Sequence, residues 1–110
     1  MADAVRETLE ERGWAVESCA DGAEALRLLG STTDFDLLVF DNDLPGLGGL
    51  ELIRQARRLP NRCRLPIIML SASDVEAQAR RAGADAFLRK PNDIGRLAHT
   101  IARFLSEDNP

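Results

Sequence analysis

Short runs of consecutive apolar residues alternate along the chain with longer stretches whose apolar positions recur at helical spacing. Residues 37–40 and 67–70 are apolar throughout, which is typical of strands buried on both faces of a parallel sheet. Residues 86–88 form a third short apolar run, and residues 14–19 alternate like a short strand. The pattern therefore predicts at least four strands.

Helices are expected between these strands. Gly13 is a good C-cap for a first helix, Asp21 caps a second, and Pro60 stops a third. Strands separated by helices of this length imply βαβ units, so we expect an α/β fold with a doubly wound parallel sheet. The chain is one domain over 1–105, with a frayed tail at 106–110. Further helices are expected from Ser73 or Asp74 to Gly83 and from Asp93 to Leu105.

The charge of the chain limits its partners. Its 14 basic and 18 acidic residues give a formal net charge of −4. An acidic surface gives no reason to expect direct contact with nucleic acid or with a membrane. No apolar run approaches the roughly 18 residues that span a bilayer, and the first residues lack the apolar segment of a signal peptide, so we expect a cytoplasmic protein. Cys19 and Cys63 lie far apart in sequence and are expected to be free thiols.

Three polar residues follow the predicted strands directly. Asp41 comes after residues 37–40, Ser71 comes after residues 67–70, and Lys90 ends the strand near residue 88. Ligands and chemistry gather at the carboxyl ends of parallel strands, so these side chains are expected at one edge. A carboxylate can become an acyl phosphate, while a hydroxyl and an ammonium can bind the phosphoryl oxygens. Taken singly, each residue is also consistent with a turn, a helix cap or a solvated side chain.

Three stretches of the chain resemble the receiver domains of bacterial two-component response regulators. They are residues 37–49 (LLVFDNDLPGLGG), 66–72 (PIIMLSA) and 83–91 (GADAFLRKP). The resemblance covers nearly the whole chain and implies a flavodoxin-like receiver fold and a role in phosphorelay signal transduction, with no enzyme activity. The expected partners are a histidine kinase or phosphotransfer protein and a downstream effector.

Carried over position by position, the resemblance implies roles for four side chains. Asp41 would be the phosphoacceptor, and Lys90 would pair with the phosphoryl group. Ser71 would be the switch hydroxyl, and Phe87 would turn inward as Ser71 moves. The Lys90–Pro91 peptide bond would be cis. A simpler interpretation makes Phe87 an ordinary core aromatic residue.

The sequence also departs from the resemblance at its start. Similar domains begin with an apolar strand that ends in an acidic pair, and Met1 corresponds to a position after that pair. Mg²⁺ would then keep only the Asp41 side chain and the backbone carbonyl of Asp43, so we expect weak metal binding and slow phosphorylation. We also expect the remaining strands to close up or another chain to cover the gap, with a domain-swapped or tight homodimer preferred.

Two other functions fit some of the same residues. A haloacid-dehalogenase-type phosphatase also uses Asp-x-Asp after a strand, here Asp41 and Asp43, but it needs an acidic motif after the lysine, where only Asp93 is available. A degenerate receiver, never phosphorylated, would act purely as a protein-interaction module. A basic patch with a solvated or partner-docking surface is also expected, formed by Arg54, Arg57, Arg58, Arg62 and Arg64.

Overall fold

A computed structural model describes residues 2–44 and 46–107 of the chain. Helices and strands alternate along it, which confirms the α/β class predicted from the spacing of apolar residues. The elements in order are α1 (Ala2–Glu11), α2 (Gly22–Leu29), β1 (Leu38–Asp41), α3 (Gly49–Arg58), β2 (Ile67–Ser71), α4 (Glu76–Ala82), β3 (Ala86–Arg89), the 3₁₀-helix η1 (Ile94–Arg96) and α5 (Leu97–Glu107). None of the described helices combines the length and the apolar character that crossing a bilayer requires.

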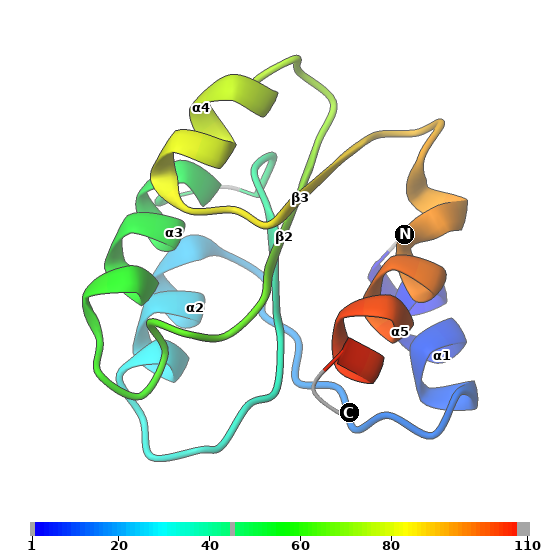
Figure 1. The fold of residues 1–110 in the computed structure, drawn as a ribbon, viewed down its shortest axis with the longest axis horizontal. Coiled ribbons are helices and arrows are strands. Elements are labelled where there is room, and N and C mark those ends of the chain that lie inside the picture. Colours follow the sequence, from blue (N-terminus) through cyan, green and yellow to red (C-terminus); the bar gives the residue numbers. More distant parts are fainter. Residues whose placement is uncertain (1, 45, 108–110) are drawn as a thin grey trace.

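The sheet has three parallel strands in the order β1-β2-β3. All five residues of the central strand β2 are buried, as its uninterrupted apolar run predicts. Helices α2, α3 and α4 lie on one side of the sheet and α1 and α5 on the other, as Figure 1 shows. This doubly wound arrangement brings the carboxyl ends of all three strands to one edge.

Each face of the sheet packs into its own apolar cluster, because successive side chains of a strand point to opposite faces. Leu38 and Phe40 of β1 join a cluster with α2, α3 and α4, whereas Val39 packs against a cluster with α1 and α5. Ile53 and Ala56 on α3 are fully buried in the first cluster, as the helical spacing of their run predicts. Burying one such aliphatic side chain contributes about 1.5–3 kcal/mol.

Residues 14–19 do not form the strand that their alternation predicts. They cross between α1 and α2 as chain without regular structure, and no backbone hydrogen bond among the described residues joins them to β1. A strand needs a neighbour that pairs its N–H and C=O groups, and alternation alone does not supply one. The expectation that the remaining strands would close up is therefore wrong.

A cavity of about 570 Å³ separates residues 14–19 from β1. Its lining is mostly apolar and comes from both layers of helices as well as from the sheet. The space opens to solvent, so it is a groove in the surface and not a void in the interior. Apolar residues that line it include Leu9, Val16, Leu28, Leu29, Val39, Leu97 and Ile101.

Helix ends agree with the sequence at some positions and differ at others. Asp21 is the N-cap of α2, as predicted, and its carboxylate accepts the N–H of Glu24 at 2.9 Å. Helix α4 instead begins after Val75, which makes no side-chain cap hydrogen bond. Ser73 does not cap this helix, because its N–H donates to the Ser71 hydroxyl in a turn before the helix begins. Helix α5 continues through Glu107, and the rest of the predicted tail, 108–110, lies outside the described residues.

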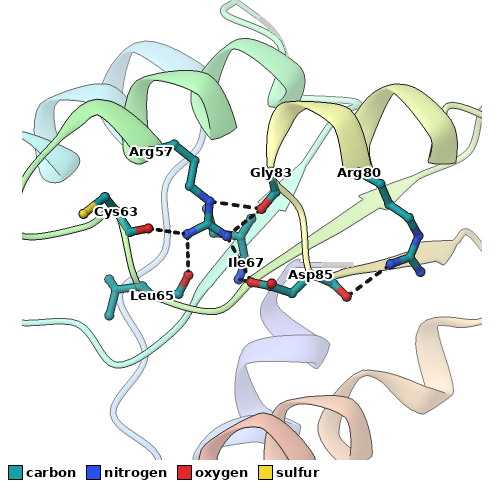
Figure 2. A network of polar contacts seen from close by, with 7 residues as sticks. All are labelled: Arg57, Cys63, Leu65, Ile67, Arg80, Gly83 and Asp85. Carbon is teal, nitrogen blue, oxygen red and sulfur yellow. Dashed lines mark hydrogen bonds and ion pairs between the residues drawn. The ribbon is translucent and has the colours of Figure 1, made fainter.

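Two arginines of the predicted basic patch, Arg57 and Arg62, do not form an open charged surface, because their guanidinium groups bind backbone carbonyls. Arg57 lies inside the loop network drawn in Figure 2, where it donates to the carbonyls of Gly83, Cys63 and Leu65 and pairs with Asp85 at 3.0 Å. One guanidinium presents five donors in a rigid fork, so it can tie several loop carbonyls together at once. Arg57 therefore fixes the loops that precede β2 and β3.

Arg62 also differs from the prediction of an exposed basic patch, because only 1% of this residue is exposed. Its guanidinium donates to the carbonyls of Leu29 and Ser31 at 3.1 and 3.0 Å, and it lies 4.7 Å from the centre of the Phe35 ring. A cation at the carboxyl end of α2 satisfies carbonyls that the helix leaves unpaired. The exposed arginines of the predicted patch are Arg54, Arg58 and Arg64.

Candidate functional site

The three polar residues predicted to converge do end neighbouring strands. Asp41 is the last residue of β1 and lies beside Leu70, while Ser71 ends β2 and lies beside Arg89. Lys90 follows β3 directly, and its backbone N–H donates to the Ser71 carbonyl at 2.9 Å. The parallel register therefore sets a carboxylate, a hydroxyl and an ammonium along one edge of the sheet.

Lys90 is the centre of this edge. Its Nζ donates to Oδ1 and Oδ2 of Asp41 at 2.8 and 3.0 Å, and it lies 3.0 Å from Oδ2 of Asp43. Only 11% of the lysine side chain is exposed, against 24% for Asp41, so the pair is partly screened from water. One cation thus offsets two carboxylates that a loop has brought together.

Asp43 contributes its side chain as well as its backbone. Its N–H donates to Oδ1 of Asp41 at 2.9 Å, and its own carboxylate accepts the N–H of Ala72 at 2.9 Å. The sequence predicted a role for the Asp43 carbonyl and missed this carboxylate, although its position two residues after Asp41 is a signal for it. The Asp43 side chain links the loop after β1 to the loop after β2.

The pKa values of Asp43 and Lys90 shift in opposite directions. Partial burial favours a higher pKa for Asp43, but the Ala72 N–H and the Lys90 ammonium outweigh it and hold the pKa below its usual value. For Lys90, burial favours a lower pKa, and the hydrogen bonds and charges of Asp41 and Asp43 raise it above the usual value instead. The ion pair therefore stabilises the charged forms of Lys90 and Asp43.

Ser71 and Phe87 occupy different surroundings. Ser71 is fully buried, and its Oγ accepts the N–H of Ser73 at 3.1 Å. Within residues 2–44 and 46–107, Ser71 Oγ makes no hydrogen bond to Asp41 or Lys90. Phe87 is half-buried and packs against the cluster on the side of α2, α3 and α4. The structure thus places Ser71 at the site and Phe87 beside the core.

Two further polar side chains shape the loops of the site, and the sequence singled out Asp93 only as a helix start and as an acid after the lysine. Asn42 Oδ1 accepts the N–H of Gly49 at 3.0 Å, which closes the loop between β1 and α3. Asp93 accepts the N–H of Arg89 at 3.0 Å, and its own N–H donates to the Arg89 carbonyl at 2.7 Å. This contact spans the Lys90–Pro91 bond, which is cis as the resemblance implied.

The residues present make an incomplete site for a divalent cation. No group of three or more His, Cys, Asp or Glu side chains suited to a metal ion occurs within the described residues. Asp41 and Asp43 supply oxygen ligands of the kind that Mg²⁺ prefers. Both carboxylates, however, are already paired with the Lys90 ammonium. The donor set does not fit a dedicated magnesium site.

This edge of an α/β sheet pairs two carboxylates with one lysine, and comparison with known proteins gives the family of the chain. The family model of the response regulator receiver domain matches residues 1–102, so the chain belongs to the receiver domains of two-component response regulators. It is 37% identical over 110 residues to the phosphate regulon transcriptional regulatory protein PhoB of Rhizobium meliloti. That match covers 96% of this chain and 48% of PhoB, so the chain spans about half the length of its curated relative.

Solved structures agree with the family. The receiver domain of the sensor histidine kinase PA1611 from Pseudomonas aeruginosa, with a magnesium ion in its active site cleft, is 29% identical with a TM-score of 0.78. That match covers 96% of this chain and 85% of the other. A Burkholderia pseudomallei response regulator with a phosphorylated aspartic acid and a calcium ion is 28% identical, with a TM-score of 0.73 and coverage of 99% and 68%. The receiver fold predicted from the resemblance is confirmed.

Proposed function

We propose that Asp41 accepts a phosphoryl group and that the domain passes this event on as a change of shape. The observation that carries the proposal is the pairing of Lys90 Nζ with both oxygens of Asp41 at 2.8 and 3.0 Å. An ammonium in this position can offset the charge that phosphorylation adds. A phosphorylated aspartic acid in the related Burkholderia protein supports the assignment of this chemistry to the family.

The proposed step is a single displacement. An oxygen of Asp41 attacks the phosphorus of a phosphohistidine or a small acyl phosphate, and the bond between phosphorus and the donor breaks. The electron pair of that bond leaves with the donor, and Asp41 becomes an acyl phosphate. Lys90 stays charged throughout, since its pKa is raised, and it remains beside the new phosphoryl oxygens.

The switch that follows involves Ser71 and Phe87. We propose that the Ser71 hydroxyl leaves the Ser73 N–H and turns toward the phosphoryl oxygens, which are strong acceptors. The space that Ser71 vacates lets the half-buried Phe87 pack further inward, so the surface around β3 and α5 changes. A histidine kinase or phosphotransfer protein would supply the phosphoryl group, and a downstream effector would bind the changed surface.

Metal binding is proposed to be weak in this chain. Mg²⁺ would use the Asp41 side chain and the Asp43 carbonyl, and it would supply electrostatic stabilisation of the transferring group. The related domains with magnesium and calcium make a divalent cation plausible for the family, but two carboxylates shared with Lys90 form a poor cation site. Phosphorylation is therefore expected to be slow, and the degenerate receiver is the second candidate function.

Labelling with a small acyl phosphate tests the proposal. The purified chain is incubated with acetyl phosphate with and without Mg²⁺, and one added phosphoryl group is sought by intact mass spectrometry. We expect slow, partial labelling that Asp41→Asn abolishes and that Asp36→Asn, a change at an exposed aspartate before β1, leaves intact. Equal labelling of the Asp41→Asn variant would refute the acceptor assignment. A wild-type chain that stays unlabelled would favour the degenerate receiver, and rapid labelling with Mg²⁺ would contradict weak metal binding.

A further inference from the structure

A small hollow lies on the surface between α3 and α4, which are neighbours on one side of the sheet in Figure 1. It measures about 180 Å³ and is lined by Arg54 of α3 and by Gln78, Arg81 and Ala82 of α4. Gln78 and Arg81 are three residues apart on their helix, so they share one face of it. Two guanidinium groups and an amide from two separate helices therefore meet at one place.

The side chains of this hollow carry hydrogen-bond donors that lack acceptors. Neither Gln78 nor Arg81 forms a side-chain hydrogen bond or an ion pair with any described residue. The Arg54 guanidinium donates once, to Oε1 of Glu51 at 3.3 Å, although it carries five N–H donors. Gln78, Arg81 and Arg54 are all exposed, so their donors are open to a molecule that arrives from solvent.

One carboxylate is already bound on this surface. Glu51 accepts from Arg54 through one oxygen and from Nε2 of Gln55 through the other, at 3.3 and 3.0 Å. The Gln55 hydrogen bond lowers the pKa of Glu51 most, and the hydrogen bond and charge of Arg54 lower it further. An amide and a guanidinium thus stabilise an ionised carboxylate. In the hollow, α4 offers the same two groups to a second one.

The surroundings of the hollow are basic, although the chain is acidic elsewhere. Residues 49–85 hold seven basic and four acidic residues, whereas the remaining residues hold seven basic and fourteen acidic ones. Arg58 lies four residues after Arg54 on α3, so it extends the basic surface along that helix. A local excess of one sign of charge attracts partners of the opposite sign.

From these observations we propose that the hollow between α3 and α4 is a docking site for an acidic segment of a partner protein. One carboxylate of the segment pairs with the guanidinium groups of Arg54 and Arg81, and Gln78 donates an amide N–H to the same carboxylate. A neighbouring acidic residue of the segment meets Arg58. The proposal goes beyond phosphoryl transfer and does not depend on it.

Two other acidic occupants fit the charges less well. Duplex DNA carries about one charge per 1.7 Å of its axis, so it would extend past the hollow and meet the acidic remainder of the chain. A second copy in a two-fold interface would set the basic surface against itself, and like charges placed together are repulsive. The homodimer expected from the sequence stays a prediction, and self-association becomes one outcome of the test.

A peptide titration tests the proposal. The probe is a short capped peptide in which glutamate and alanine alternate, and its matched control carries glutamine in place of every glutamate. Binding is followed by NMR of the isotope-labelled chain, which reports backbone N–H groups and arginine Nε–H groups. We expect saturable shifts at Arg54, Gln78 and Arg81, an affinity that falls as the salt concentration rises, and no shifts with the glutamine peptide.

Protein variants distinguish the hollow from a general attraction between charges. Arg81→Gln should weaken the glutamate peptide by about fivefold. Arg103→Gln is the matched control, because it makes the same change of charge at an exposed residue of α5, on the other side of the sheet, and should leave the affinity unchanged. The double variant Arg54→Glu with Arg81→Glu should lose the glutamate peptide and bind a matched lysine peptide, a charge swap that a folding defect cannot imitate.

Four results would overturn the proposal. One is the absence of glutamate-peptide binding at concentrations up to about 1 mM. Another is equal weakening by Arg81→Gln and Arg103→Gln, because the peptide would then respond to net charge alone. The third is tighter binding of a DNA duplex at the same residues. The fourth is self-association that the double variant abolishes, since a second copy would then occupy the hollow. None of these measurements involves phosphorylation, so failure here is separate from failure at Asp41.

Discussion

Lys90 carries the charge balance of the site. It holds the carboxylates of Asp41 and Asp43 within 3.0 Å, and only 11% of its side chain is exposed. Two aspartates this close to one another repel unless a cation lies between them. The same ammonium that can stabilise a phosphoryl group therefore also stabilises the unmodified fold.

Replacing Lys90 by methionine should lower the free energy of unfolding by about 1–3 kcal/mol, since two partly buried carboxylates lose their counter-charge. The measurement is urea denaturation at neutral pH. Arg54→Met is the matched control, because Arg54 pairs with Glu51 on an exposed helix surface, with 49% and 37% of the two side chains exposed. That control should change stability by less than about 0.5 kcal/mol. Equal effects of the two variants would contradict the role given to Lys90.

The pKa shifts predict how stability depends on pH. Asp43 has a folded pKa below its ordinary 3.8, so its contribution is present above that value and is lost as the pH falls through the lower folded pKa. Lys90 has a folded pKa above its ordinary 10.5, so its contribution is present below that value and is lost as the pH rises past it. Between these limits, neither group adds a slope.

Denaturation curves of the wild type and of Asp43→Asn, measured over a range of pH, isolate the contribution of Asp43 to stability at acidic pH. The amide can still accept the Ala72 N–H but no longer carries the charge that pairs with Lys90. The stability difference between the two proteins should be constant from about pH 5 to 9 and should shrink below about pH 4. A difference that grows in acid would show that the sign of the Asp43 shift is wrong.

At the scale of elements, close backbone approach positions α2 against the loop after β1. Gly22 begins α2, and a Cβ built there would lie 2.8 Å from the Cβ and N of Leu47 and against its carbonyl oxygen. Backbone atoms of a loop cannot yield as a flexible side-chain end can. Gly22 is therefore a steric requirement of the loop that runs from Asp43 to Gly49.

Gly22→Ala should destabilise the domain by about 1–3 kcal/mol through overpacking. Gly95→Ala is the control in η1, where an added Cβ meets no atom within 4 Å and φ is not positive. This control should be neutral or stabilising by up to about 1 kcal/mol, because alanine restricts the unfolded chain. Thermal denaturation of both variants checks the pair, and similar losses in both would remove the steric argument.

Hydrogen exchange should alternate along β1, whose N–H groups point in turn to β2 and to the cavity. The N–H groups of Leu38, Phe40 and Asn42 are expected to be protected, and those of Val39 and Asp41 to exchange fast. Residue-resolved exchange measured by NMR tests this directly. Uniform protection along β1 would show that the outer edge of this strand is already paired.

At the scale of the whole molecule, the cavity separates residues 14–19 from the sheet. The cavity opens to solvent, so the apolar side chains that face it are less well packed than those around the fully buried strand β2. The chain on the N-terminal side of the cavity should therefore open locally more readily than the rest.

Limited trypsin digestion tests this local opening. Cleavage should begin at Arg12, an exposed residue between α1 and the unpaired segment 14–19, and should come later at the buried Arg62. First cleavage among Arg54, Arg57 and Arg58 would instead show that α3 is the weaker part.

Sequence alone predicted most of the elements and the strand ends at which Asp41, Ser71 and Lys90 lie. Uninterrupted apolar runs before Asp41 and Ser71 predicted the two strands that carry them, because fully buried strands exclude polar residues. Helical spacing predicted the buried face of α3, a local motif predicted Asp21 as a cap, and the resemblance to receiver domains implied the cis bond before Pro91. These features depend on each residue and its near neighbours in the chain.

Tertiary structure decided what depends on distant partners. Residues 14–19 have the alternation of a strand but lack a paired neighbour, so only the arrangement in space shows that they stay unpaired. Arg57 and Arg62 look like solvated charges in the sequence, yet loop carbonyls far along the chain bind them. The Asp43 carboxylate likewise finds Ala72 and Lys90 only after the strands align. Pairing, burial and cavities are properties of the assembled chain, and composition and periodicity carry no record of them.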